Sequence, residues 1–300
     1  EGRLVSPETI VGAVRWRLGR GRVLAGKKVV VTAGGAREHL DPVRYIGNGS
    51  SGRMGFALAQ AAIDEGADTT LVSANVELPP PWGASVLRAV SAADVLRSTH
   101  EACADADALL MAAAVADYTP ASPSTSKLKK HGGELTLQLA ETEDVLASLR
   151  RDGLVKVGFA AETDNLLETA RVKLARKGLD LIVANDAAAT IGAAEADVAI
   201  IGADGVLEQT GLVPKEAAAE RVVAALVRIL ASREPAAEEY WAIMYGRCTA
   251  STGGAGFRRI IRFVLSATPV ERRWGVDYDA DDTGRRTTDA GARRDGGTRR

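Results

Sequence analysis

The chain has 300 residues, of which 46% are hydrophobic and 26% are charged, and its formal net charge is −1 at pH 7. This length and apolar content suffice for one large domain or two modest ones, and the charge argues against partners recruited by overall charge. The two cysteines lie far apart and the three histidines are isolated from one another, which predicts neither a disulfide framework nor a multi-histidine metal site. No apolar run could cross a bilayer, so we predict a cytoplasmic protein that binds neither membrane nor nucleic acid.

The predicted elements begin with an amphipathic helix over residues 7–19, with Ser6 as N-cap and Pro7 at the first helical position. Apolar runs typical of buried strands then alternate with helical patterns. This alternation predicts an α/β fold with a Rossmann-like, doubly wound and mainly parallel sheet. Strands are expected from about residue 28 and at 69–73, 86–90, 108–113, 155–160 and 179–184, and helices at 52–65, 92–104, 144–151 and 165–177.

Smaller elements are predicted in the second half of the chain. Polar and apolar residues alternate over 134–139, which predicts a half-exposed strand. Residues 198–201 and 206–207 flank the turn Ala203-Asp204-Gly205 and predict a small β-hairpin added to the main sheet. A closing helix is expected at 215–230.

The stretch between the first strand and the following helix carries the strongest functional signal. Two glycine-containing clusters, 34–35 and 50–52, lie there. Free backbone N–H groups and the helix dipole both favour phosphate at such a junction. The long polar insert between the clusters is unusual for a plain dinucleotide loop. The candidate phosphate-loop and substrate residues are Gly34, Gly35, Arg44, Asn48, Ser50, Ser51 and Gly52.

Two later segments have the chemistry to bind a nucleotide. Met111, Ala112 and Ala113 end a predicted strand, and Asp117 follows where ligands lie in open α/β sheets. Small residues let a flat base approach the backbone. The basic loop at 127–130 could close over a triphosphate and neutralise charge in a phosphoryl-type transition state.

Four further residues lie at strand ends or on one helix face. Phe159 ends a predicted strand and could stack on a base. Lys173 and Lys177 are four residues apart on the next helix, so they share a face and could point at phosphates. Asn185 follows an apolar strand and is expected at the same edge of the sheet.

The order and spacing of these motifs resemble the phosphopantothenate–cysteine ligases (phosphopantothenoylcysteine synthetases) over about residues 1–231. The motifs are the Gly-Gly loop, Asn-x-Ser-Ser-Gly, Ala-Ala-Val-Ala-Asp, Lys-Leu-Lys-Lys, Gly-Phe-Ala-Ala-Glu-Thr and Ala-Asn-Asp. The resemblance implies that CTP, with Mg²⁺, activates the carboxylate of 4′-phosphopantothenate as an acyl-cytidylate. The amine of cysteine then attacks, which forms the amide and releases CMP.

The resemblance also implies roles for individual residues. Asn48 and Lys127 are the expected catalytic residues, with Asn48 acting on the acyl-cytidylate and Lys127 contacting the phosphates from a closing loop. Mg²⁺ is expected to be held mainly by the triphosphate, so no metal ligand is assigned. The implied nucleotide-binding residues are Met111, Ala112, Ala113, Asp117, Lys127, Glu143, Asp144, Val145, Leu146, Phe159, Lys173 and Lys177.

Three regions are expected along the chain. Residues 1–24 resemble the end of the flavin-dependent decarboxylase half that precedes this synthetase in many bacteria, and 25–232 form the synthetase domain. Residues 233–300 are predicted to be an irregular or disordered tail, because their end is rich in Arg, Asp, Gly and Thr. The resemblance further implies a homodimer, no flavin in this chain, and a decarboxylase domain or subunit as a possible partner.

Two other functions stay open. An NAD(P)-dependent oxidoreductase would share the fold, but no G-x-G-x-x-G follows the first strand and no acid ends the second strand cleanly. A catalytically silent nucleotide-binding module is the second alternative. Ala36 and Gly49 depart from the family pattern within the phosphate loop and keep that alternative open.

Overall fold

A computed structural model describes residues 4–130, 132–162, 166–186 and 193–233. The chain divides into two units, Glu1–Pro235 and Ala236–Arg300, and every described residue belongs to the first. Apart from Arg233, the predicted tail therefore lies outside the described residues. The three-region division itself stays a prediction.

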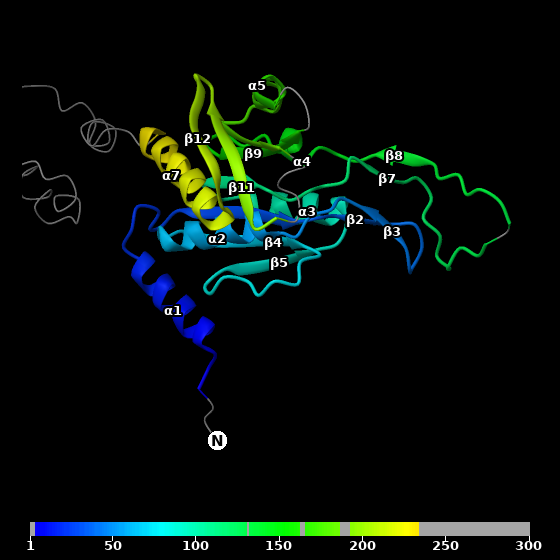
Figure 1. The fold of residues 1–300 in the computed structure, drawn as a ribbon, viewed down its shortest axis with the longest axis horizontal. Coiled ribbons are helices and arrows are strands. Elements are labelled where there is room, and N and C mark those ends of the chain that lie inside the picture. Colours follow the sequence, from blue (N-terminus) through cyan, green and yellow to red (C-terminus); the bar gives the residue numbers. More distant parts are fainter. Residues whose placement is uncertain (1–3, 131, 163–165, 187–192, 234–300) are drawn as a thin grey trace, which may run out of the picture. The chain divides into compact units, whose positions relative to one another are not determined.

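The first unit is built on an eight-stranded sheet in the order β12-β11-β10-β9-β6-β1-β4-β5 (Figure 1). Neighbours from β5 to β10 are parallel, and β11 and β12 join antiparallel. The strands are β1 (Lys28–Gly34), β4 (Asp68–Ala74), β5 (Ser85–Ala89), β6 (Ala108–Met111), β9 (Val155–Glu162), β10 (Leu181–Asp186), β11 (Glu195–Gly202) and β12 (Gly205–Pro214).

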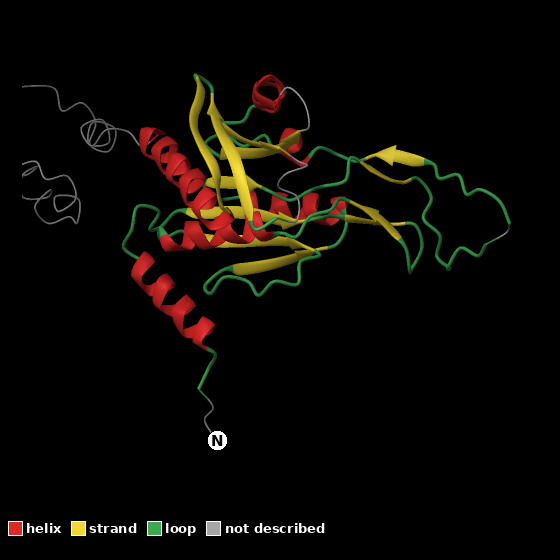
Figure 2. Ribbon diagram, in the orientation of Figure 1, coloured by secondary structure: helices red, strands yellow, loops and turns green. Residues whose placement is uncertain are grey.

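Helices cover both faces of this sheet (Figure 2). The helices α2 and α7 pack on one face and against each other, whereas α3, α4 and α5 contribute to the core on the opposite face. The helices are α1 (Pro7–Gly19), α2 (Arg53–Asp64), α3 (Ala92–Cys103), α4 (Val145–Ser148), α5 (Leu166–Lys177) and α7 (Lys215–Arg233).

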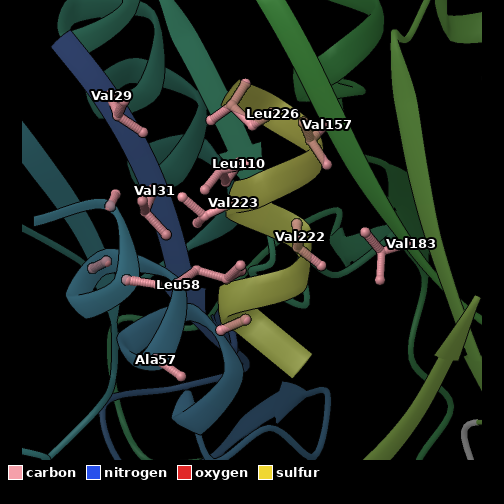
Figure 3. Packing of buried hydrophobic residues seen from close by; sticks show 14 of the residues in the cluster. Val29, Val31, Ala57, Leu58, Leu110, Val157, Val183, Val222, Val223 and Leu226 are labelled. Carbon is pink, nitrogen blue, oxygen red and sulfur yellow. The ribbon is translucent and has the colours of Figure 1, made fainter. Parts of the chain in front are cut away.

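Burial on both faces explains why the central strands are continuous apolar runs rather than alternating ones. Within β1, Val29 and Val31 belong to the core under α2 and α7, and Val30 belongs to the core on the other face. Figure 3 shows the first of these cores, where valines of the sheet face Leu58 of α2 and Leu226 of α7. The two helix layers thereby fix the strand ends at which the ligand site lies.

The predicted sheet is confirmed as mainly parallel with helices on both faces. The expected hairpin is confirmed as β11 and β12, which are longer than predicted and extend the sheet beyond β10. The helix at 7–19 is also confirmed, and the Ser6 side chain accepts a hydrogen bond from the Thr9 N–H at its start.

Several element boundaries were wrong, including those of the strand expected at 179–184, which spans Leu181–Asp186. The strand expected at 134–139 is absent except for its last residue, because Leu135 and Leu137 are exposed and have no partner strand. The helix expected at 144–151 ends at Ser148, since Leu149 is already extended. The strand expected at 108–113 ends at Met111.

Two short ribbons were not predicted. β2 (Arg37–His39) pairs with β3 (Tyr45–Gly47), and β7 (Tyr118–Pro120) pairs with β8 (Leu139–Glu141). The chain between β7 and β8 projects away from the main sheet as an arm (Figure 1). This arm carries the basic loop at 127–130.

Candidate functional site

A cavity of about 660 Å³ lies at the carboxyl edge of the parallel strands. Its walls come from the loop before α2, the segment after β6, the start of α4, and single residues of β9, α5, β10, β11 and α7. The predicted residues that line it are Asn48, Ser50, Ser51, Gly52, Met111, Ala112, Ala113, Asp117, Glu143, Asp144, Val145, Leu146, Phe159, Lys177 and Asn185.

Glycines let the phosphate loop approach neighbouring backbone. A Cβ on Gly34 would lie 2.0 Å from the Ala74 carbonyl oxygen, and its φ of +90° also favours glycine. A Cβ on Gly35 would lie 2.7 Å from the Asn48 carbonyl oxygen. Gly34 and Gly35 thus allow the phosphate loop to pack closely on neighbouring backbone, and neither residue lines the cavity.

Hydrogen bonds hold the segment after β6 in place. The Thr32 hydroxyl accepts from the Ala113 N–H at 3.0 Å, and the Asn48 side-chain amide donates to the Val115 carbonyl at 3.1 Å. The Thr142 hydroxyl donates to the carbonyl of Ala116 at 2.6 Å. The segment 111–117 is therefore fixed from β1, from the phosphate loop and from the approach to α4. Such a wall can present backbone N–H and C=O groups to the edge of a base.

Asp144 links α4 to α5 at the cavity rim. Its side chain accepts from the N–H groups of Leu146 and Ala147, each at 3.1 Å, which makes it the N-cap of α4. The Lys177 ammonium lies 2.9 Å from the other carboxylate oxygen. Burial raises the pKa of Asp144, but the hydrogen bond from Lys177 and those from the backbone outweigh it, so the pKa is lowered. Asp144 is therefore a carboxylate at neutral pH.

Two cations line the cavity beside the phosphate loop. Arg53 is the first residue of α2, and Lys215 is the first residue of α7. Lys215 is 6% exposed, and burial lowers the pKa of its ammonium. No role was predicted from the sequence for Arg53 or for Lys215. The one signal for Lys215 was a lysine at a predicted helix start, where the helix dipole disfavours a cation.

Lys127 does not line the cavity of its own chain. Its loop is held at the turn between β2 and β3, where the Arg44 guanidinium donates to the Leu128 carbonyl at 2.7 Å. Buried Asp41 accepts from the Leu128 N–H at 3.1 Å and pairs with Arg44. Burial raises the pKa of Asp41, but the hydrogen bonds from Arg44 and from backbone N–H groups outweigh this and lower it.

Of the other predicted residues, Arg44 stays at the β2–β3 turn and Lys173 lies on α5 outside the cavity wall. Residue 165, the first of the helix predicted at 165–177, falls outside the described residues. At position 36, where the sequence departs from the family pattern, the contact is made by the backbone. The Ala36 N–H donates to the Ala114 carbonyl at 3.1 Å.

The acids of the cavity are compatible with a magnesium nucleotide. Within the described residues, no group of three or more His, Cys, Asp or Glu side chains could hold a metal ion. Asp117 and Glu143 line the cavity, and Mg²⁺ commonly binds one or two carboxylates together with substrate phosphates. The donor set therefore fits a Mg²⁺ held mainly by a triphosphate.

None of the helices in the described part of the chain is long and apolar enough to span a membrane.

Comparison with known proteins adds a family. The family of the DNA/pantothenate metabolism flavoprotein C-terminal domain matches residues 24–230. The coenzyme A biosynthesis bifunctional protein CoaBC of Bacillus subtilis (strain 168) is 43% identical over 206 residues, which cover 67% of this chain and 51% of that protein. Its namesake from Vibrio cholerae serotype O1 is 42% identical over 190 residues, 62% of this chain and 47% of that protein. The chain spans about half the length of these curated relatives.

A solved structure agrees with the sequence relatives. The crystal structure of the C-terminal domain of coenzyme A biosynthesis bifunctional protein CoaBC aligns with a TM-score of 0.62 and 33% identity. The alignment covers 70% of this chain and 99% of that domain. The similarity therefore extends over the whole of the solved domain.

Proposed function

Because the chain belongs to the family of the DNA/pantothenate metabolism flavoprotein C-terminal domain, we propose that it is a CTP-dependent phosphopantothenate–cysteine ligase. It joins 4′-phosphopantothenate to L-cysteine in coenzyme A biosynthesis, in the cytoplasm, with Mg²⁺ bound to CTP. The observation that carries this proposal is the cavity, because one site gathers most of the positions at which the chain matches the ligase motifs.

The reaction proceeds in two balanced steps. A carboxylate oxygen of 4′-phosphopantothenate attacks the α-phosphorus of CTP, and the bond to the β-phosphate oxygen breaks to release pyrophosphate. The cysteine amine then attacks the carbonyl carbon of the acyl-cytidylate. The carbon–oxygen bond breaks, the nitrogen loses a proton, and CMP leaves with the former carboxylate oxygen.

The cavity residues divide these tasks. The backbone of 111–113 and the side chain of Phe159 bind the cytosine, while Asp117 and the start of α4 bind the ribose side of the nucleotide. Asn48 acts on the acyl-cytidylate, supported by its place in the cavity wall, where its side-chain amide donates to the Val115 carbonyl. Enclosure by preorganised backbone dipoles stabilises the charge that develops during both steps.

A homodimer is part of this proposal, and the arm is its contact. Leu135 on the arm, Tyr118 on β7 and Leu139 on β8 are exposed, and covering such apolar side chains favours association. Lys127 lies on the arm and does not line its own cavity, and the next residue, Leu128, is hydrogen-bonded to the β2–β3 turn. Lys127 therefore contacts the nucleotide phosphates in the cavity of the second copy. Exchange of one element between identical copies satisfies two-fold symmetry.

Pyrophosphate release tests the ligase directly. The purified chain is expected to release pyrophosphate with 4′-phosphopantothenate, Mg²⁺ and CTP, and to form CMP only when cysteine is added. Asn48→Asp and Lys127→Gln should each abolish product formation, and Lys129→Gln, on the same loop, is the matched control. Protection of the chain against unfolding by NADPH instead of CTP would support the oxidoreductase. CTP binding without turnover would support the silent module.

Mixing the two inactive variants tests the shared site. If Lys127 acts in the second copy, Asn48→Asp and Lys127→Gln chains together rebuild one intact site per mixed dimer, which gives about a quarter of wild-type activity. If Lys127 acts within its own chain, the mixture stays inactive. A chain that sediments as a monomer while remaining active would contradict the dimer.

A further inference from the structure

Asn75 is the one residue other than glycine, in the described part of the chain, whose φ is positive. It directly follows β4, and its φ of +54° lies in the left-handed region. Asparagine tolerates this region better than most side chains, but the conformation still costs free energy. Such residues persist only where their surroundings hold them, and they cluster at functional sites. The contacts of Asn75 are therefore a place to look for a function.

The side-chain amide of Asn75 joins two segments of backbone beside the cavity. Its nitrogen donates to the carbonyls of Gly35 and Val90, each at 2.8 Å. Both partners are acceptors, so the nitrogen and not the oxygen must face them, and both of its hydrogens are used. The Val90 carbonyl also accepts from the Arg37 N–H at 2.8 Å. Asn75 thus holds one end of the segment 35–37 directly and the other end through Val90.

Gly35 connects this anchor to the segment that carries Asn48. A Cβ on Gly35 would lie 2.7 Å from the Asn48 carbonyl oxygen and 3.5 Å from the Cβ of Ser50. The backbone of Gly35 therefore packs directly against residues 48–50. On its other side, Asn48 donates its side-chain amide to the Val115 carbonyl. A displacement of Gly35 would therefore displace Asn48 within the cavity wall.

Val76, the next residue, supports the same loop by packing. It is 8% exposed, and a Cβ on Gly34 or on Gly52 would lie 2.4 or 2.5 Å from its Cγ2. The Val76 side chain therefore lies against both glycine clusters of the phosphate loop. Neither Asn75 nor Val76 lines the cavity. Any effect of these two residues on the reaction must therefore pass through the loop.

We propose that Asn75 is a positioning residue for Asn48, which it holds in place through the carbonyl of Gly35. This inference rests on the proposed ligase function, in which Asn48 acts on the acyl-cytidylate. A displacement of about 1 Å from the productive geometry can lower a rate by about 100-fold. The nucleotide is bound mainly by other elements, so loss of the anchor slows the cysteine-dependent step more than it weakens CTP binding.

The rates of the two half-reactions in the full chain test this role. Asn75→Gly removes the amide but adopts the left-handed backbone without strain, and Asn75→Asp keeps the shape but cannot donate. In both variants, pyrophosphate release in the first turnover without cysteine and the KM for CTP should change less than about twofold. Cysteine-dependent CMP formation should fall about 10-fold or more. Glu77→Gly, at an exposed position of the same loop, is the matched control and should match the wild type.

Three results would overturn the positioning role. Equal losses in pyrophosphate release and in CMP formation would show that Asn75 only supports the fold. An equal loss of CMP formation in Glu77→Gly would assign the effect to greater freedom of the loop. Wild-type rates of CMP formation in both Asn75 variants would remove Asn75 from the reaction.

Failure of the ligase proposal gives a different result, because the wild-type chain would then release no pyrophosphate. Amide hydrogen exchange over residues 46–52 tests the anchor in that case, since it reports local opening without any turnover. Exchange should be faster in Asn75→Gly than in the wild type and unchanged in Glu77→Gly. Unchanged exchange in Asn75→Gly would overturn the anchor itself.

Discussion

The Thr32 hydroxyl joins the central strand to the nucleotide wall, so its removal should affect stability and binding together. Thr32 is fully buried, and its oxygen accepts from the Ala113 N–H at 3.0 Å and donates to the Met111 sulfur at 3.2 Å. Thr32→Val keeps the side-chain shape but leaves the N–H without that acceptor. A fully buried unpaired donor costs about 1–3 kcal/mol, and because the Ala113 N–H is only part-buried we expect the free energy of unfolding to fall by about 1 kcal/mol.

CTP affinity should fall together with stability in Thr32→Val. The segment 111–117, which positions the base, loses its hydrogen bond to β1. Urea unfolding and CTP titration measure the two effects, and a tenfold loss of affinity corresponds to about 1.4 kcal/mol. Thr32→Ser keeps the oxygen and should retain CTP affinity. Thr69→Val is the matched control, since its buried hydroxyl bonds the Ala67 carbonyl instead. The reasoning is refuted if Thr32→Val matches the wild type in both assays, or if Thr32→Ser loses as much CTP affinity.

Three further changes test other parts of the fold and site. Gly55→Ala places a Cβ 2.4 Å from the Cβ of Ala33. Urea titration should show that the free energy of unfolding falls by about 1–3 kcal/mol, or that the variant does not fold. Wild-type stability would contradict the close packing of α2 on β1. Hydrogen bonds from Ser91 and Arg97 lower the pKa of Asp94 from 3.8 to about 2. The ionised Asp94 therefore stabilises the fold by about 1 kcal/mol above pH 3.8, and this contribution is lost as the pH falls through 2. Asp94→Asn should remove this acid dependence from the free energy of unfolding. Asp144→Ala removes the α4 cap and should cost about 1 kcal/mol in thermal or urea unfolding, whereas equal stability of Asp144→Ala and Asp144→Asn would argue against the cap.

The parts of the fold that the sequence predicts are those set by continuous local patterns. Val29, Val30 and Val31 indicate a strand buried on both faces, and Ser6 with Pro7 marks a helix start, because each signal is read within a few residues. The three-residue ribbons escape prediction, since they are too short for any period. They are fixed by pairing with distant segments.

The site shows the same division. Asn48, Asp117 and Asp144 follow strands or precede helices, so topology alone brings them to one edge of the sheet. Lys215 is brought to the phosphate loop by the packing of α7 on α2, which no local pattern encodes. The position of Lys127 on the arm likewise depends on the hydrogen bonds that the backbone of its neighbour Leu128 makes with Asp41 and Arg44.

Oxygen-isotope transfer tests the central claim most directly. The full chain is supplied with 4′-phosphopantothenate labelled with ¹⁸O in its carboxylate, together with CTP, Mg²⁺ and cysteine, and the products are analysed by mass spectrometry. An acyl-cytidylate pathway predicts one ¹⁸O atom in CMP and none in pyrophosphate. Label in orthophosphate would indicate an acyl phosphate, and formation of the amide with unlabelled CMP would contradict the proposed ligase chemistry.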